Sequence, residues 1–265
     1  MSSASARESF AELEQRARTV PPAARLQLSP LGFDVIAELK LRSPAAGRLG
    51  EPSDDWLERV RAYAQGGAAA VSVLTEPSRF DGSLEHLRLA CAALRPLNVP
   101  GMRKDFLVDP YQVLEARAAG AGGVLVIVRM LSRAQMTRLL DAAAEFKLFV
   151  LLEAFDAADL AAARELLAAR GGGGAAAGID DILVGINSRD LQTLKVVPER
   201  FAGLAPLLPG GRPAVAESGV ASAADAARMM RLGYRVALIG TALMSCDDPA
   251  RLLGEILATT RTVPV

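Results

Sequence analysis

The stretch VIAELKLRSPAAG, residues 35–47, combines a buried strand with two ionisable side chains. Its first six residues are apolar apart from Glu38 and Lys40, which stand two residues apart. Side chains alternate across a β-strand, so we expect these two groups on the same face. Burying an acid and a base costs several kcal/mol of desolvation unless each has partners. The stretch alone fits two interpretations equally: a structural ion pair at a strand end, or one half of an active site.

The chain is long enough for one large hydrophobic core. It has 265 residues, of which 51% are hydrophobic, and α/β barrels of this size usually form a single domain. We therefore expect one domain over residues 1–265. Lys and Arg together number 30, and Asp and Glu also number 30, so the basic excess typical of nucleic-acid or membrane-surface binding is absent. We expect no nucleic-acid partner and no membrane partner.

Targeting, disulfide and metal signals are missing from the sequence. No apolar run reaches the roughly 18 residues of a transmembrane span, and the start, MSSASARESF, has no apolar signal core. These features predict a cytoplasmic protein. Cys91 and Cys246 lie far apart, which predicts neither a disulfide nor a metal site. His86 is the single histidine, and we expect it on the surface of a helix, which excludes histidine-based triads and metal sites.

Short apolar strands alternate with longer amphipathic helices along the chain. The expected strands cover 35–40, 70–74, 101–104, 124–128, 149–153, 182–186, 214–217 and 236–239. The expected helices cover 8–18, a segment from a cap at 54–55 to about 64, 84–93, 110–119, 132–145, 157–169, 198–207, 222–232 and 248–258. Strands separated by helices run parallel, and eight such units favour a closed (β/α)8 TIM barrel over an open doubly wound sheet.

Two segments stand outside this repeating pattern. Residues 1–34 form an N-terminal extension with one extra helix, and a Pro21-Pro22 break follows that helix. Residues 171–178 are a run of Gly and Ala, which we interpret as a flexible surface insertion between a helix and a strand.

Polar side chains gather at the predicted strand ends. In a barrel of this kind the reactive groups lie at the carboxyl ends of the strands, where side chains point into the mouth. The residues in these places are Glu38, Lys40, Lys104, Glu153, Asn187 and Glu217. Six polar groups on one rim are hard to explain as solvated surface. We therefore predict an active site at this end of the barrel.

Two lysines among three carboxylates suit proton transfer. A lysine acts as general acid near neutral pH if burial and a neighbouring cation lower its pKa, and a carboxylate acts as base if burial raises its pKa. We expect Lys40 and Lys104 to disfavour each other's charge while the carboxylates compensate. The alternative for Lys104 is a plain salt bridge to Asp105, and its place at a strand end favours the functional role.

A phosphate site is predicted at the last two strand ends. Ser218 and Gly219 follow the seventh predicted strand, and Gly240 and Thr241 follow the eighth and open a short helical turn. Barrels commonly hold phosphate at these two loops, where glycines allow backbone N–H groups to approach an anion closely.

An apolar slot is the third predicted part of the site. The candidate lining residues are Pro44, Phe80, Phe106, Leu125 and Leu191. Such residues often only fill the hydrophobic core. Because Phe80 and Phe106 lie in loops just past strand ends, they could instead contact a flat or aromatic substrate.

At these residues the chain resembles the indole-3-glycerol phosphate synthase family. The matching segments are IAELKLRSP (36–44), SVLTEPSRFDGSLEHL (72–87), RKDFLVDPYQVLEARAAGA (103–121), VLVIV (124–128), GINSRDLQTL (185–194), AESGV (216–220) and LIGTALM (238–244). The resemblance implies a cofactor-free and metal-free reaction of tryptophan biosynthesis, catalysed by a carboxy-lyase. In it, 1-(2-carboxyphenylamino)-1-deoxyribulose 5-phosphate closes its ring with loss of carbon dioxide and water.

The resemblance also implies a role for each site residue. Lys104 resembles the family's lysine that acts as general acid on the substrate carbonyl, and Glu153 resembles the glutamate that acts as base in the dehydration. Lys40 resembles the lysine that contacts the substrate carboxylate, and it could itself donate a proton. Glu38 would relay protons, and Asn187 and Glu217 would orient the hydroxyl-bearing chain. The implied phosphate contacts are Ser43, Ser218, Gly219, Gly240, Thr241 and Arg189, and the implied ring contacts are Pro44, Phe80, Phe106, Leu125 and Leu191.

Several alternatives stay open. Ala45-Ala46 replaces the frequent Ser-Lys of the family, and Ala154-Phe155 replaces a frequent Val-His, which leaves room for a specialised pathway with a substituted substrate. A phosphoribosylanthranilate isomerase would need a Cys/Asp pair at strands one and four, and a non-catalytic barrel should lose its costly charges. The expected partner is a small phosphorylated substrate, and the expected assembly is a monomer or a weak homodimer.

Overall fold

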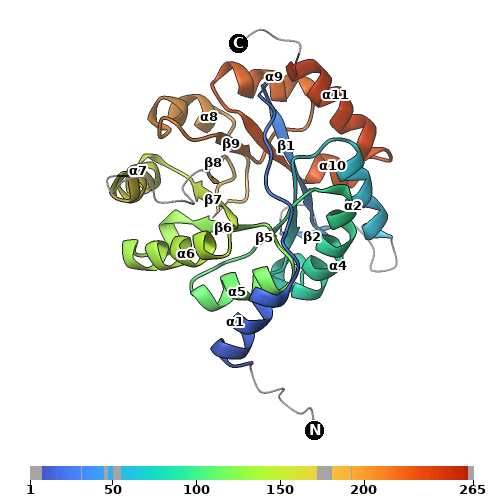
Figure 1. The fold of residues 1–265 in the computed structure, drawn as a ribbon. Coiled ribbons are helices and arrows are strands. Elements are labelled where there is room, and N and C mark those ends of the chain that lie inside the picture. Colours follow the sequence, from blue (N-terminus) through green and yellow to red (C-terminus); the bar gives the residue numbers. More distant parts are fainter. Residues whose placement is uncertain are drawn as a thin grey trace.

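A closed barrel of eight parallel strands forms the centre of the molecule, and helices surround it in chain order (Figure 1). The computed structural model describes residues 8–30, 32–44, 47–49, 55–171, 181–191 and 193–261. The barrel strands are β1 (Asp34–Leu39), β4 (Ala70–Leu74), β5 (Gly101–Lys104), β6 (Gly123–Ile127), β7 (Phe149–Ala154), β8 (Ile182–Asn187), β9 (Ala214–Glu217) and β10 (Val236–Ile239). Each strand pairs with the next, and β10 closes the barrel against β1. The predicted TIM barrel is confirmed.

The helices occupy the predicted segments closely. One helix, α1 (Phe10–Thr19), precedes the barrel. The others are α2 (Trp56–Gln65), α3 (Pro77–Phe80), α4 (Leu84–Leu94), α5 (Pro110–Ala118), α6 (Arg133–Glu145), α7 (Ala157–Gly171), α8 (Glu199–Leu204), α9 (Ala223–Arg231), α10 (Thr241–Ser245) and α11 (Pro249–Arg261). Several begin at a Ser or Asp whose side chain accepts a hydrogen bond from the first turn, as at Asp55, Ser83 and Asp109.

The structure refines the sequence prediction in three places. The predicted helix 198–207 is α-helical only to Leu204 and continues as a 3-10 turn (Ala205–Leu207), because Pro206 has no N–H to donate. The segment after β4 carries the single turn α3, which Pro77 begins and Glu76 caps. The loop after β1 forms a small hairpin of β2 (Arg42–Ser43) and β3 (Gly47–Arg48).

Side-chain alternation along the strands separates two apolar layers. The outward residues, such as Val71 and Val73 of β4, pack against the helices in the larger core. The inward residues fill the barrel interior, and they are Ile36, Ala70, Met102, Leu125, Ile127, Phe149, Leu151, Phe155, Leu183, Val215, Val236 and Leu238. The interior is therefore a packed core rather than a pore.

The segment between α1 and β1 covers the amino-terminal end of the barrel. Leu26 and Leu28 pack against the inward apolar cluster. They also line a cavity of about 200 Å³ beside the start of β8. Arg235 donates hydrogen bonds to the backbone oxygens of Gly32 and Ser29, which fixes the segment where it enters β1. Because this segment covers the amino-terminal end of the barrel, the carboxyl-terminal end is the one available for a site.

Some predictions concern single residues or lie outside the described residues. Both cysteines are free, and His86 is half-buried on α4 with its ring 5.2 Å from that of Trp56, so it is less exposed than expected. Within the described ranges, no helix has the length and apolarity needed to cross a membrane. The Gly/Ala run beyond Gly171, the substitutions Ala45-Ala46 and the Asp54 cap lie outside the described residues. The cytoplasmic location and the monomer or weak homodimer stay predictions.

Candidate active site

Lys104 lies between two buried carboxylates at the carboxyl end of the barrel. Its Nζ is 3.0 Å from Glu153 Oε2 and 3.1 Å from Glu217 Oε2. These residues end or nearly end β5, β7 and β9, at inward positions of the alternation. The side chain of Lys104 is 14% exposed and that of Glu217 is 1% exposed. An ammonium and two carboxylates from three separate strands therefore meet in one largely dry place, as predicted from the strand ends.

The alternative partner of Lys104 is excluded by the geometry. Asp105 does not pair with Lys104; its Oδ2 is 3.0 Å from Nη2 of Arg103, on the opposite side of the strand. The ammonium is consequently left to the inward carboxylates.

A glycine makes room for this cluster. The inward position of β8 level with Glu153 is Gly185, and a Cβ there would overlap Oε1 of Glu217. That Oε1 is buried and has no hydrogen-bond partner among the described residues. Sequence reasoning missed Gly185, although a glycine inside a strand is a signal of close approach by another group.

The carboxylates dominate the electrostatics of the cluster. Burial alone would lower the pKa of Lys104, but the charges of Glu153, Glu217 and Glu38 outweigh burial and raise this pKa well above its usual value. This direction agrees with the expectation that the carboxylates compensate where the two lysines disfavour each other's charge. Burial, and then the nearby Glu153, raise the pKa of Glu217 well above its usual value. Burial thus favours the protonated form of Glu217 more than that of an exposed glutamate.

Glu38 and Lys40 form a second ion pair on β1 and just beyond it. Lys40 Nζ lies 2.8 Å from Glu38 Oε1, and both side chains are almost buried. Burial would raise the pKa of Glu38, but Lys40 and Lys104 outweigh it and lower this pKa. Gly240 lies against this pair, and a Cβ there would overlap Glu38 Oε1 and come within 3.2 Å of Lys40 Nζ. The pair is thus a salt bridge, as the first interpretation of this stretch expected, and it lies beside the Lys104 cluster. Its place in an active site stays a prediction.

The residues after β8 and β9 are tied to one another. Oδ1 of Asn187 accepts hydrogen bonds from Oγ of Ser218 at 3.0 Å and from the backbone N–H of Arg189 at 2.9 Å. Ser188 Oγ donates to the backbone oxygen of Ser218. Ser218 and Gly219 both have positive φ angles, 66° and 86°, so the chain turns sharply there. The two loops therefore act as one wall of the mouth.

The other predicted phosphate contacts come from separate parts of the chain. Arg189 donates from Nη1 to the backbone oxygen of Leu194, and its charge contributes to the low pKa of Glu38. Ser43 is buried in β2, and Thr241 is exposed at the first position of α10.

The predicted ring contacts fall into two groups. Pro44, Phe106 and Leu191 are exposed and Phe80 is half-buried on α3. Leu125 is buried in the barrel interior, where it pairs in register with Leu151, one inward position below Glu153. Ile127 is the β6 residue level with Glu153, and it is a candidate that the sequence analysis did not single out.

One departure from the family pattern, Phe155, has a structural partner. Phe155 follows Glu153 on the inward side and is buried, and the guanidinium of Arg129 lies 4.5 Å from the centre of its ring. Arg129 also pairs with Asp156 and Asp159, and Asp159 accepts the backbone N–H of Phe155. The loop after β7 is therefore held by a cation over an aromatic ring.

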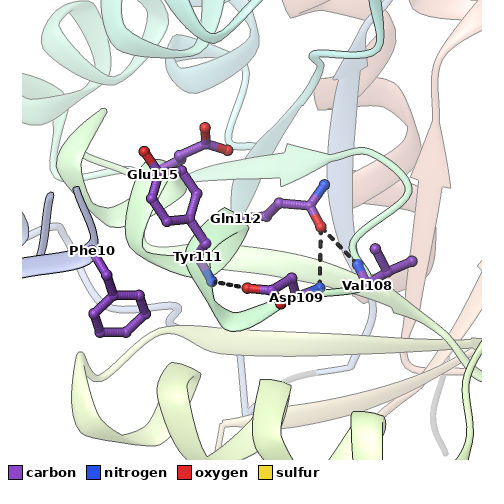
Figure 2. Close-up of a pocket in the computed structure, with 6 residues that line it drawn as sticks. All are labelled: Phe10, Val108, Asp109, Tyr111, Gln112 and Glu115. Carbon is purple, nitrogen blue, oxygen red and sulfur yellow. Dashed lines mark hydrogen bonds between the residues drawn. The ribbon is translucent and has the colours of Figure 1, made fainter. Parts of the chain in front are cut away.

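A larger cavity lies away from these charges. It has a volume of about 710 Å³ and is bounded by α1 and the start of α5, where Phe10, Tyr111 and Gln112 line it (Figure 2). No predicted site residue lines it. We place the site at the barrel mouth, because the ionisable groups converge there. Over the described ranges, no group of three or more His, Cys, Asp or Glu side chains is arranged to hold a metal ion.

A (β/α)8 barrel with an ammonium–carboxylate cluster at the carboxyl ends of its strands has the form of an acid–base enzyme. Comparison with known proteins specifies the family. The sequence model of indole-3-glycerol phosphate synthase matches residues 1–256, so the chain belongs to the indole-3-glycerol phosphate synthase family, whose members are carboxy-lyases of tryptophan biosynthesis. The family predicted from the sequence motifs is confirmed.

Individual relatives agree with this assignment. The chain is 46% identical over 218 residues to indole-3-glycerol phosphate synthase of Nocardioides sp., covering 82% of this chain and 77% of that protein. It is 40% identical over 251 residues to the enzyme of the same name from Parafrankia sp., covering 94% and 87%. A solved structure, thiamine phosphate pyrophosphorylase from Pyrococcus furiosus, superposes with a TM-score of 0.58 at 17% identity over 87% of this chain and 95% of that one, a likeness of fold alone.

Proposed function

We propose that Lys104 is the general acid of the ring closure and Glu153 the base of the dehydration. The aromatic carbon that bears the carboxylate bonds to the carbonyl carbon of the deoxyribulose chain while Lys104 gives a proton to the carbonyl oxygen. The carboxylate leaves as carbon dioxide and its electron pair restores the aromatic ring. Glu153 then takes a proton from the carbon next to nitrogen, and the new hydroxyl group leaves as water with a proton from the cluster. The observation that carries the proposal is Lys104 Nζ at 3.0 and 3.1 Å from two carboxylates.

The raised pKa values determine where protons are held before the substrate binds. An ammonium whose pKa is raised is fully protonated when the substrate arrives, so an acid is available at neutral pH. Glu217, whose pKa is also raised, can supply the proton that the leaving hydroxyl group needs. When the substrate carbonyl takes the place of one carboxylate beside Lys104, the ammonium loses part of its stabilisation and becomes a stronger acid.

The ion pair of Glu38 and Lys40 is the proposed contact for the carboxylate on the aromatic ring of the substrate. We assign Lys40 to the substrate carboxylate, because it is the other cation at the mouth predicted for catalysis, and Glu38 to proton relay at 2.8 Å from it. Asn187 and Glu217 orient the hydroxyl-bearing chain. The proposed phosphate contacts are Ser43, Ser218, Gly219, Gly240, Thr241 and Arg189, and the proposed ring contacts are Pro44, Phe80, Phe106, Leu125 and Leu191.

Turnover of the synthetic substrate tests the proposal. Purified protein treated with a chelator is mixed with 1-(2-carboxyphenylamino)-1-deoxyribulose 5-phosphate, and the indole product is followed by fluorescence. We expect turnover by the wild type and a loss of about 10²–10⁴-fold in kcat for Lys104→Met. Lys147→Met is the matched control, because Lys147 is exposed on the turn before β7, at the other end of the barrel. Wild-type kcat in a folded Lys104→Met protein would overturn the role of Lys104.

Two observations weigh against an isomerase. That chemistry needs a Cys/Asp acid–base pair at the ends of the first and fourth strands, but the end of β1 carries Glu38 and Lys40. Cys91 is buried on α4. Burial raises the pKa of the Cys91 thiol to about 12, which keeps it inert. A gene deletion separates primary from specialised function: tryptophan auxotrophy that indole relieves and anthranilate does not would assign the chain to primary synthesis.

A further inference from the structure

Arg103 is a buried cation on the outer face of the strand that carries Lys104. Outward positions of the barrel strands are otherwise filled by residues such as Val71 and Val124, which pack against helices. Arg103 occupies such a position on β5, and its side chain is 5% exposed. A guanidinium in this place destabilises the fold unless its donors are satisfied. The partners of Arg103 therefore indicate what it is for.

All three guanidinium nitrogens are used, and the acceptors come from three parts of the chain. Nε donates to Thr75 Oγ1 at 3.2 Å, just beyond β4. Nη1 donates to the backbone oxygen of Gln112 at 2.8 Å and to Glu115 Oε2 at 3.0 Å, both on α5. Nη2 donates to Asp105 Oδ2 at 3.0 Å. One side chain thus joins the end of β4, the loop after β5 and the helix that follows.

The acceptors of Arg103 hold the two peptide groups that follow Lys104. Thr75 donates its backbone N–H to the backbone oxygen of Lys104 at 3.1 Å, and its hydroxyl group donates to Asp105 Oδ2 at 2.6 Å. The other oxygen of Asp105 accepts the backbone N–H of Phe106 at 2.8 Å. Groups on the outer face of β5 consequently fix the backbone at Lys104, and with it the position and direction of the Lys104 side chain.

Gln112 extends the same network through the rest of the loop. Its side-chain oxygen accepts the backbone N–H groups of Val108 and Asp109 (Figure 2). Its amide nitrogen donates to the backbone oxygen of Phe106. Because Nη1 of Arg103 binds the backbone oxygen of Gln112, the loop and the first turn of α5 are fixed relative to β5.

We propose that Arg103 is a positioning residue for the ring closure: it binds Asp105 on the outer side of β5, which leaves the Lys104 ammonium to Glu153, Glu217 and the substrate. This inference rests on the function proposed above. Without Arg103, the largely buried Asp105 carboxylate would lose its cationic partner, and the adjacent Lys104 would be the cation nearest to it in the chain. Lys104 would then turn towards Asp105 and away from the reacting carbonyl.

The test compares Arg103→Met with the double variant Arg103→Met/Asp105→Asn. We expect the single variant to lose at least about tenfold in kcat, since small displacements of a reacting group have effects of this size, with KM nearly unchanged. Adding Asp105→Asn removes the competing carboxylate, and we expect it to recover part of the lost kcat. A purely structural role predicts a further loss instead, which would overturn the proposal, as would wild-type kcat in Arg103→Met.

Arg117→Met is the matched control for loss of a buried guanidinium. Arg117 is buried on α5, the helix that Arg103 contacts, but it donates to the backbone oxygens of Val20 and Pro21. We expect it to lower the melting temperature without lowering kcat. If Arg103→Met does not fold, Arg103→Lys takes its place: an ammonium cannot satisfy four acceptors in three directions, so kcat should still fall, and an unchanged kcat would refute the proposal.

A structural readout separates this proposal from the proposed function. In a crystal structure of Arg103→Met we expect Lys104 Nζ nearer to Asp105 than to Glu153. If the wild type lacked turnover, the proposed function would fail, but this distance would still decide whether Arg103 directs Lys104. Lys104 in its wild-type place, beside Glu153 and Glu217, would refute the positioning role.

Discussion

The two ends of β7 contrast in chemistry although they face the same interior. Phe149 begins the strand and fills the space that Gly123 leaves open on β6, whereas Glu153, two inward positions further on, pairs with Lys104. Both side chains are at least 95% buried. One end is stabilised mainly by apolar packing, and the other holds the charges that we propose take part in the reaction. If that proposal holds, the barrel separates stability and activity along a single strand.

Glu153→Gln tests the mouth end and should have the largest effect. The amide keeps the shape of the side chain but cannot take a proton, so we expect kcat to fall about 10²–10⁴-fold. The free energy of unfolding should change little, because the amide can still accept a hydrogen bond from Lys104. Steady-state kinetics and urea denaturation on the same preparation measure both effects. A kcat within a few-fold of the wild type would remove Glu153 from the mechanism.

Phe149→Ala tests the closed end of the same strand. Removing a buried aromatic ring leaves a cavity, and we expect a loss of about 3–5 kcal/mol in the free energy of unfolding. The kcat of the fraction that remains folded should stay near the wild-type value. A large fall in kcat without loss of stability would contradict the separation of the two ends.

Glu217→Gln tests whether the charged end of the barrel makes the stability of the protein depend on pH. The folded-state pKa of Glu217 is raised, so the native protein holds a proton there that the unfolded chain releases above its ordinary glutamate pKa. The stabilising contribution is therefore complete below that ordinary value and is lost as pH rises through the raised folded value, at up to about 1.4 kcal/mol per pH unit. Melting temperatures between pH 4 and pH 9 should show this decline in the wild type and lack it in Glu217→Gln. Parallel curves would show that Glu217 is ionised in the folded protein.

Arg25→Ala gives the smallest expected effect. Arg25 and Asp181 lie 4.0 Å apart at the closed end, and the arginine is largely exposed. Exposed pairs contribute little, so we expect a change within about 0.5 kcal/mol and an unchanged kcat. A change of several kcal/mol would mean that ion pairs, and not apolar packing, hold this end together.

The strands and the identities of the charged groups could be predicted from the sequence, but their pairing could not. β5 and β9 begin and end where their apolar patterns predicted, because alternation and flanking turns are local signals. The partners of Lys104 come from strands about 50 and 110 residues further along the chain, and only closure of the barrel brings them together. Asp105 adjoined Lys104 in sequence and was a plausible partner until Arg103 was seen to bind it. Gly185 shows the same limit, since its role is the space that Glu217 occupies.

The most direct test of the central claim is a crystal structure with a reduced substrate analogue, in which a hydroxyl group replaces the reacting carbonyl. We predict that Lys104 Nζ lies within hydrogen-bond distance of that oxygen while Lys40 contacts the carboxylate on the ring. Lys40 at the oxygen, with Lys104 still bound only to Glu153 and Glu217, would contradict the account.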